Sequence, residues 1–144
     1  MIPADLTAPA VLGDIVCAFT ADVRPQPKER PRVTGRGTFT PQRTRDFEEA
    51  IARCAQAAMK GRPATREPVR MIALFEQTDR RPSDLDNHLK ALADGLSSRR
   101  ASKAHMGRIG PVLVNDAQIL EIRARMVRGA QRNQVTVLIE ELDR

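Results

Sequence analysis

Apolar residues along this chain gather into short runs that are separated by polar turns. Runs of this length predict β-strands. We expect five strands, at residues 11–19, 69–75, 112–114, 118–127 and 134–141. The run at 69–75 is largely apolar, so its strand is expected in the centre of a sheet. Residues alternate in the last run, which places Val135, Val137 and Ile139 on one face.

Two longer segments have the periodicity of α-helices. Thr40 and Pro41 suit the N-cap and first position of a helix, which we expect to continue to about Met59 and to stop at Gly61. Its buried stripe would consist of Phe47, Ile51, Ala55 and Ala58. The second helix is expected to end near Gly95. It carries leucines at helical spacing, at Leu85, Leu89, Leu92 and Leu96.

Between the first strand and the first helix, Gly35 and Gly37 predict a small hairpin or ordered loop over residues 32–40. The predicted order is therefore strand, hairpin, helix, strand, helix and three further strands. This order favours a single α+β domain spanning residues 1–144, in which two main helices pack on one mixed β-sheet.

The charge of the chain points toward nucleic acid. The 144 residues carry 24 Lys and Arg against 18 Asp and Glu, a net charge of +6, and 20 of the basic residues are Arg. Arg binds phosphate bidentately, although a GC-rich genome would also raise the share of Arg. Residues 24–45 hold seven basic residues against Glu29 alone, and residues 95–115 hold four with no acid. Such uneven placement is typical of a surface that binds a phosphate backbone.

Composition also excludes several classes of protein. The longest apolar runs are too short to cross a membrane, and residues 1–10 lack the basic and apolar parts of a secretory signal. Cys17 and Cys54 have neither metal-ligand spacing nor a disulfide framework. We therefore expect a cytoplasmic protein. The chain has no Trp or Tyr, which argues against a single-strand binder that stacks bases.

The segment that most suggests chemistry is 80–90, which holds Asp84 and Asp86 at a spacing of two. In extended chain this spacing puts both carboxylates on one face, whereas in a helix they would point about 200° apart. Pro82 disfavours helix at the residue before it, so we expect the helix to begin near Asp86 or Asn87. Neighbouring carboxylates repel unless a cation lies between them, and Mg²⁺ or Mn²⁺ prefers oxygen ligands.

Asp116 is a third candidate ligand. The predicted strand at 112–114 ends just before it, and a strand that ends beside the start of the helix would bring Asp116 to the same point. Three carboxylates in basic surroundings suit metal-assisted phosphodiester hydrolysis. Lys90 lies one helical turn after Asp86 and would contact the scissile phosphate.

Each of these residues also has a structural interpretation. Either aspartate of the pair, or the serine before them, can cap the helix. Lys90 has the spacing for ion pairs with Asp86 and Asp94, and Asp116 can be a turn residue. A pair of aspartates at this spacing is common, so the pattern alone does not decide between these interpretations.

Taken together, these segments resemble the RusA family of Holliday junction resolvases. The similarity extends over residues 15–140 and includes the basic N-terminal segment. The family pattern D-x-D-N-x-x-K-x-x-x-D-[AG]-L is followed, after an apolar run, by [DN]-D-x-Q. The chain matches it at Asp84, Asp86, Asn87, Lys90, Asp94, Leu96, Asp116 and Gln118.

The resemblance implies a small homodimeric endonuclease that depends on a divalent metal. Asp84, Asp86 and Asp116 would hold Mg²⁺, with Mn²⁺ able to substitute, and Lys90 would assist at the phosphate. No organic cofactor is implied. Many relatives have an acid where this chain has Asn115, which removes one auxiliary ligand and leaves the main three.

Other polar residues are assigned by the same resemblance. Asn87 and Gln118 would orient ligands or contact phosphate, or simply form hydrogen bonds at a helix start and a strand end. Arg80 and Arg81 would contact DNA, or be a solvated pair after a strand. The full set of expected DNA contacts is Lys28, Arg30, Arg32, Arg80, Arg81, Arg99, Arg100 and Lys103.

Three further expectations concern loops and histidines. Residues 97–110 are longer than the family's usual connection, and would be either a basic arm that contacts DNA or a tolerated insertion. Residues 1–10 are expected to be a flexible N-terminus. His88 and His105 have no spacing for zinc and are expected to be ordinary surface or loop residues.

The leading hypothesis is thus a Mg²⁺-dependent endonuclease of bacterial or phage origin that resolves four-way DNA junctions by paired symmetric cuts, in recombination and repair. Dimerisation would supply two sites that match the symmetry of the junction. One alternative is a nuclease that acts on other branched DNA, such as forks or flaps. The other is a non-catalytic basic nucleic-acid-binding protein, for which an acidic cluster beside the DNA-binding face would have no use.

Overall fold

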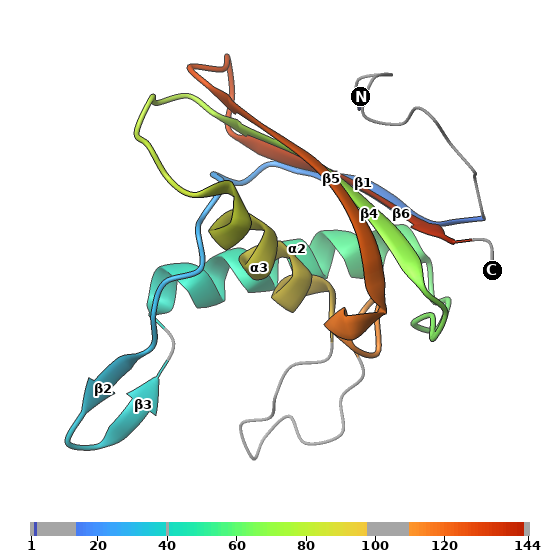
Figure 1. The fold of residues 1–144 in the computed structure, drawn as a ribbon, viewed down its shortest axis with the longest axis horizontal. Coiled ribbons are helices and arrows are strands. Elements are labelled where there is room, and N and C mark those ends of the chain that lie inside the picture. The colour runs from blue at the N-terminus through green and yellow to red at the C-terminus, as the bar shows by residue number, and fades with distance from the viewer. Residues whose placement is uncertain (1, 3–13, 40, 98–109, 143–144) are drawn as a thin grey trace.

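The computed structural model of the protein describes residues 2, 14–39, 41–97 and 110–142, with Arg32 described by its backbone alone. It is the expected α+β fold, with a mixed sheet and two helices (Figure 1). The elements in chain order are β1 (Ile15–Ala21), β2 (Arg32–Thr34), β3 (Gly37–Phe39), α2 (Gln42–Met59), β4 (Val69–Gln77), α3 (Leu85–Leu96), the 3₁₀ helix η2 (Asp116–Gln118), β5 (Ile119–Arg128) and β6 (Gln134–Glu141).

The main sheet has the strand order β1-β6-β4-β5. Strand β6 is antiparallel to both of its neighbours, whereas β4 and β5 are parallel. Parallel neighbours need a crossover connection, and α3 supplies it. The predicted central position of β4 is confirmed, because it lies between β6 and β5 and eight of its nine residues are buried.

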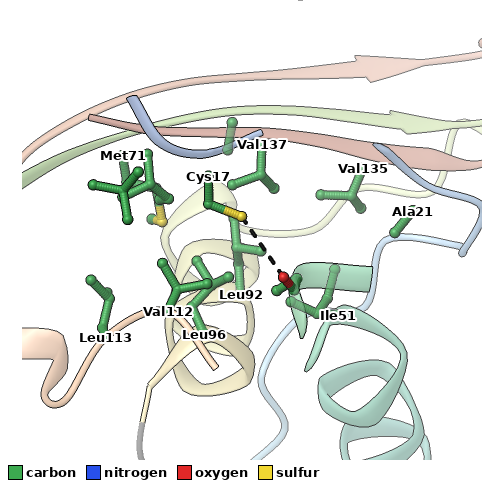
Figure 2. Close-up of a cluster of buried hydrophobic side chains, with 14 of the residues drawn as sticks. Cys17, Ala21, Ile51, Met71, Leu92, Leu96, Val112, Leu113, Val135 and Val137 are labelled. Carbon is green, nitrogen blue, oxygen red and sulfur yellow. Dashed lines mark hydrogen bonds between the residues drawn. The ribbon is translucent and has the colours of Figure 1, made fainter. Parts of the chain in front are cut away.

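Both helices pack on one face of the sheet, and the core lies between them and the strands (Figure 2). Val135, Val137 and Ile139 all point into this core, as the alternation in β6 predicts. In the same layer, the thiol of Cys17 on β1 contacts the carbonyl oxygen of Ala55 on α2 at 4.0 Å. Burial raises the pKa of this thiol, so it stays protonated and packs as a small apolar side chain.

Helix α2 follows its predicted stripe, since Phe47, Ile51 and Ala55 are buried and Ala58 is partly buried. Pro41 occupies the N-cap rather than the first helical position, and Thr40 lies outside the described residues. The helix ends where Lys60 adopts a left-handed conformation with φ 52°. Gly61 follows with φ 79°, a conformation that glycine adopts without strain.

The predicted strand at 112–114 is wrong. In this segment Leu113 forms a single isolated parallel bridge with Thr65. The backbone N–H groups of Val112 and Leu113 instead donate to the carbonyl of Leu96, which ties this segment to the end of α3. Helix α3 ends at Leu96, one residue after its predicted end near Gly95. Gly95 itself lies in the last turn, where α2 and α3 approach closely.

The hairpin of β2 and β3 confirms the prediction for residues 32–40, although Thr40 itself is not described. It projects from the body of the molecule (Figure 1). The predicted strand at 11–19 is found at Ile15–Ala21, and residues 11–13 lie outside the described part. In the described part of the chain, no helix combines the length and apolar character needed to cross a membrane.

Candidate active site

The two aspartates of the motif lie where the turn after β4 enters α3. Asp84 is the N-cap residue in an extended conformation, and α3 begins at Leu85, one residue before the expected start. The side chain of Asp84 makes no capping hydrogen bond, so the alternative of a side-chain cap is not observed there. Asp86 lies in the first turn, where its Oδ1 accepts the backbone N–H of Asn87 at 3.0 Å. Both side chains are exposed, which leaves carboxylate oxygens available to a cation.

The turn that presents Asp84 is held by hydrogen bonds rather than by a core of its own. Gln77, buried at the end of β4, donates from Nε2 to the carbonyl of Arg81 at 2.9 Å. The N–H of Arg81 donates to Oδ1 of Asp79, also at 2.9 Å. Arg128, at the end of β5, donates to the carbonyl of Ser83 at 3.1 Å. The approach to Asp84 is therefore fixed to the ends of two neighbouring strands.

An ion pair between Arg24, in the segment after β1, and Asp79 also holds this turn. Arg24 donates from Nη2 to Oδ2 of Asp79 at 2.8 Å. This hydrogen bond, with that from the backbone of Arg81, lowers the pKa of the Asp79 carboxyl. Arg80 lies against Gly129 in the turn that follows β5, where a Cβ at position 129 would come within 3.0 Å of its guanidinium.

The expectation that His88 is an ordinary surface or loop residue is wrong. It is fully buried, with 0% of its surface exposed, and its ring centroid lies 5.5 Å from that of Phe75 on β4. Its Nε2 contacts Oγ of Ser83 at 2.7 Å. Burial, together with the positive charges of Arg24 and Arg128, lowers the pKa of His88 to about 4, so the ring is neutral at pH 7. His105 lies outside the described residues.

Lys28 links helices α2 and α3 through two ion pairs. Its ammonium lies 2.7 Å from Oε1 of Glu48 on α2 and 2.8 Å from Oδ2 of Asp94 on α3. Burial alone would lower the pKa of Lys28, but the hydrogen bonds that its ammonium donates to these two carboxylates, together with their negative charges, outweigh burial and raise the pKa. The backbone N–H of Lys28 also donates to the carbonyl of Asn87 at 2.9 Å. The basic N-terminal segment is thereby held against the first turn of α3.

Lys90 differs from Lys28 because its side chain is exposed. Within the described part of the chain it has no ion pair with Asp86 or Asp94, although the spacing allows both. Asp94 instead pairs with Lys28. The ammonium of Lys90 is therefore available to bind a phosphate on the exposed side of the helix that also carries Asp86.

Asp116 begins η2 and is exposed. Asn115 caps this short helix, because its Oδ1 accepts the N–H of Ala117 at 2.8 Å, while Gln118 accepts the N–H of Asn115 at 2.8 Å. Gln118 also donates from Nε2 to the carbonyls of Thr65 and Glu67, each at 2.9 Å. Gln118 thus forms hydrogen bonds at the start of a strand, as its structural interpretation predicts. These bonds fix the turn that carries Asp116.

The expectation that Asp116 meets the start of the helix is wrong within one chain. Asp84 and Asp86 lie at the N-terminus of α3, whereas the segment leading to Asp116 is bonded to Leu96 at its C-terminus (Figure 1). The helix between these two places has 12 residues, a length of about 18 Å. No group of three acidic, His or Cys side chains suited to a metal ion occurs among the residues described.

The topology gives the reason for this separation. Asp84 follows the C-terminal end of β4, and Asp116 precedes the N-terminal end of β5. Because β4 and β5 are parallel, the C-terminal end of one strand and the N-terminal end of the other lie at opposite ends of the sheet, measured along the strands. A prediction from chain order alone misses this, since it does not show which strands are parallel.

Several predicted DNA contacts are placed by the structure. Arg30, Arg80 and Arg81 are exposed. Lys28 is half-buried and committed to two carboxylates. The side chain of Arg32 is not described, and Arg99, Arg100 and Lys103 lie outside the described residues, as does most of the predicted arm at 97–110.

Sequence reasoning missed the pairing of Ser83 with His88. A signal for the burial of His88 was present, because position 88 falls three residues after Leu85 and four before Leu92 on the apolar stripe. No comparable signal pointed to Ser83 as its partner, since the serine precedes the helix and its direction depends on the turn.

Comparison with known proteins yields one family. A family model described as Endodeoxyribonuclease RusA matches residues 22–140 of the 144-residue chain, a range that contains Asp84, Asp86 and Asp116. No curated protein matches the chain.

Proposed function

The chain belongs to the RusA endodeoxyribonuclease family, and on that premise we propose that it resolves four-way DNA junctions by paired symmetric phosphodiester hydrolysis. The reaction would require Mg²⁺, with Mn²⁺ as a substitute, and would serve DNA recombination and repair in the cytoplasm of a bacterium or a phage-infected cell. The observation that carries the proposal is the pair of exposed carboxylates at the start of α3, in a chain with a net charge of +6.

The surroundings of this pair support a metal rather than a bare acidic cluster. Arg80 and Arg81 precede the aspartates and are exposed, so DNA phosphate drawn to them would meet Asp84 and Asp86. Two carboxylates beside a phosphate repel it unless a cation lies between them. Their hard oxygen donors fit Mg²⁺ or Mn²⁺, and the side chain of Asp84 is not occupied by a capping bond.

The position of Asp116 supports a homodimer. One chain offers two carboxylates at one end of α3 and the third at the other end, so a three-carboxylate site would need a second copy. A two-fold axis would place Asp116 of each copy beside Asp84 and Asp86 of the other and would create two equivalent sites. Two sites related in this way suit the paired cuts that junction resolution requires.

Within such a site, the bound ion would supply a water of lowered pKa and would neutralise charge on the phosphate. Lys90 would bind the phosphate from the same exposed side of α3. Asn87 would orient Asp86, because the backbone N–H of Asn87 donates to Oδ1 of Asp86. Gln118 would keep Asp116 in place through its bonds to the 65–67 segment. Arg30, Arg80 and Arg81 would hold the DNA backbone.

The two alternatives make different predictions for the same substrates. A nuclease for other branched DNA would cut forks or flaps in preference to four-way junctions. A non-catalytic binder would bind branched DNA equally well with or without metal and would cut none of it.

The direct test replaces a ligand and follows cleavage of a labelled mobile four-way junction, with linear duplex and fork as comparison substrates. Asp86→Asn should lower the cleavage rate in Mg²⁺ by about a hundredfold or more, because the ion loses a charged ligand. Junction binding should be kept or improved, since one negative charge beside the phosphates is removed.

Asp22→Asn is the matched control, because Asp22 is an exposed aspartate just after β1 and outside the proposed site. It should cut like the unaltered protein, and EDTA should abolish all cutting. Undiminished cleavage by Asp86→Asn would refute the proposed metal site. Binding without any cutting, in Mn²⁺ as well, would establish the non-catalytic alternative.

A further inference from the structure

The segment that carries both proposed metal ligands is spanned by one side-chain contact. Ser83 precedes Asp84, and His88 follows Asn87, so the 2.7 Å contact between Oγ of Ser83 and Nε2 of His88 closes a loop around the aspartate pair. The backbone N–H groups of Asn87 and His88 both donate to the carbonyl of Asp84, which forms the first turn of the helix inside this loop.

Each end of this contact is itself immobilised. The ring of His88 is fully buried and packs on Phe75 in the central strand β4. The carbonyl of Ser83 accepts a hydrogen bond from Arg128 at the end of β5. The hydroxyl of Ser83 is thus held between the sheet and the helix, and Asp84 is the next residue along the chain.

A histidine at this buried position lowers the stability of the fold relative to an apolar side chain. In the described part of the chain its Nδ1 has no hydrogen-bond partner, so the ring leaves a buried polar atom unsatisfied. The adjacent leucines on α3 show that an apolar side chain suits the same stripe. What histidine adds over leucine is the bond to Ser83, and that bond acts on the turn that presents the aspartates.

We propose that Ser83 and His88 are positioning residues, whose hydrogen bond sets the direction of the Asp84 and Asp86 carboxylates for metal binding. The inference rests on the proposed function of these aspartates. A ligand that is already held in place loses less freedom when the ion binds, so the bond should appear as metal affinity. In this role neither residue would contact the ion or the DNA.

The test measures Mn²⁺ binding to the full chain by calorimetry without DNA, alongside thermal unfolding. Ser83→Ala should weaken Mn²⁺ binding about tenfold, the scale of losses when a residue that supports a metal ligand is removed. The melting temperature should fall, because the buried Nε2 of His88 loses its partner, so Mn²⁺ binding is measured well below it, where the variant is folded. Ser83→Thr keeps the hydroxyl and should restore the affinity.

Ser97→Ala is the matched control. Ser97 lies at the opposite end of the same helix, and its buried hydroxyl has no partner among the described residues, so its loss should leave Mn²⁺ affinity unchanged. In a double-mutant cycle, His88→Gln combined with Ser83→Ala should bind Mn²⁺ no more weakly than the weaker single variant. At saturating Mn²⁺, Ser83→Ala should recover most of its junction-cleavage rate.

The possible outcomes separate the two proposals. Unaltered Mn²⁺ affinity in a folded Ser83→Ala protein would refute the positioning role while leaving the metal site intact. Equal weakening by Ser83→Ala and Ser83→Thr would also refute it, because the hydroxyl would then not matter. Failure of the unaltered protein to bind Mn²⁺, with Asp86→Asn indistinguishable from it, would refute the proposed metal site itself.

Discussion

At the scale of single residues, the start of α3 combines groups with opposite needs for water. Asp84 and Asp86 are exposed and charged, while His88, two residues further on, is buried and neutral. The helix explains this contrast, since successive residues point about 100° apart and one turn presents both a solvent face and a core face. Polar chemistry and core packing therefore share a single helical turn.

Burial of His88 predicts a dependence of stability on pH. Its pKa is lowered to about 4 in the folded protein against an ordinary value near 6.5, so the unfolded chain binds more protons between these two values. The stability that neutral His88 supports is fully present above pH 6.5 and declines as the pH falls toward 4. From pH 7.5 to pH 5 the free energy of unfolding should decrease by about 2 kcal/mol through this residue.

Urea unfolding at a series of pH values measures this effect. The decrease attributable to His88 is the difference between the unaltered protein and His88→Gln, which cannot titrate in this range, so carboxylates common to both proteins cancel. Parallel stability curves for the two proteins would contradict the lowered pKa.

At the scale of elements, helical and strand periodicity predicted most of the fold. The strand at 134–141 and the buried stripe of α2 follow directly from side chains that repeat every two or every 3.6 residues. The segment at 112–114 was misassigned because a short apolar run fits a strand as well as a buried connection. The role of Gly95 was also missed, because periodicity says nothing about how closely two helices approach.

Gly95 yields a prediction at this scale. A Cβ at this position would lie 2.9 Å from Cγ2 of Ile51 and 3.1 Å from the carbonyl oxygen of Glu48, both on α2. Gly95→Ala would gain about 1 kcal/mol of helix propensity but would force the two helices apart. Since a backbone oxygen cannot rotate away, we expect a net loss of about 1 kcal/mol or more in the free energy of unfolding.

The comparison variant is Gly35→Ala, in the turn between β2 and β3, where an added Cβ meets nothing within 4 Å. It should change the free energy of unfolding by less than about 0.5 kcal/mol. Denaturant unfolding of both variants tests the contrast. A Gly95→Ala protein at least as stable as the unaltered one would show that α2 yields to the added methyl group.

At the scale of the whole molecule, the proposed site is divided between two distant places. The turn after β4 carries Asp84 and Asp86, and the turn before β5 carries Asp116. Lys28 adds a connection across the body, because its two ion pairs tie the basic N-terminal segment to both helices. Hydrogen bonds hold each of the two turns in place, and the turns lie apart within one chain.

Complementation between variants tests whether two copies complete one site. Asp86→Asn and Asp116→Asn should each be inactive alone. When they are co-expressed, a mixed dimer would carry both changes at one site and none at the other. About a quarter of the original number of sites should then be intact, and the product should be single nicks rather than paired cuts.

A mixture of Asp84→Asn with Asp86→Asn is the control, because both changes lie in the same half of the site and no pairing restores an intact one. Recovery of nicking in this control, or none in the first mixture, would contradict a site shared between two copies.

The sequence by itself determined the features that depend on neighbours along the chain. These are the strand and helix periodicities, the aspartate pair with Lys90 one turn away, and the spacing that identifies the family. Tertiary structure decided what depends on the meeting of distant segments: the buried contact of His88 with Ser83, the ion pairs of Lys28, and the place of Asp116. A side-chain pattern reports which face of its own element is buried. Which ends of two elements meet depends on whether their strands run parallel, and in this fold the parallel pairing of β4 with β5 places Asp116 away from the other two aspartates.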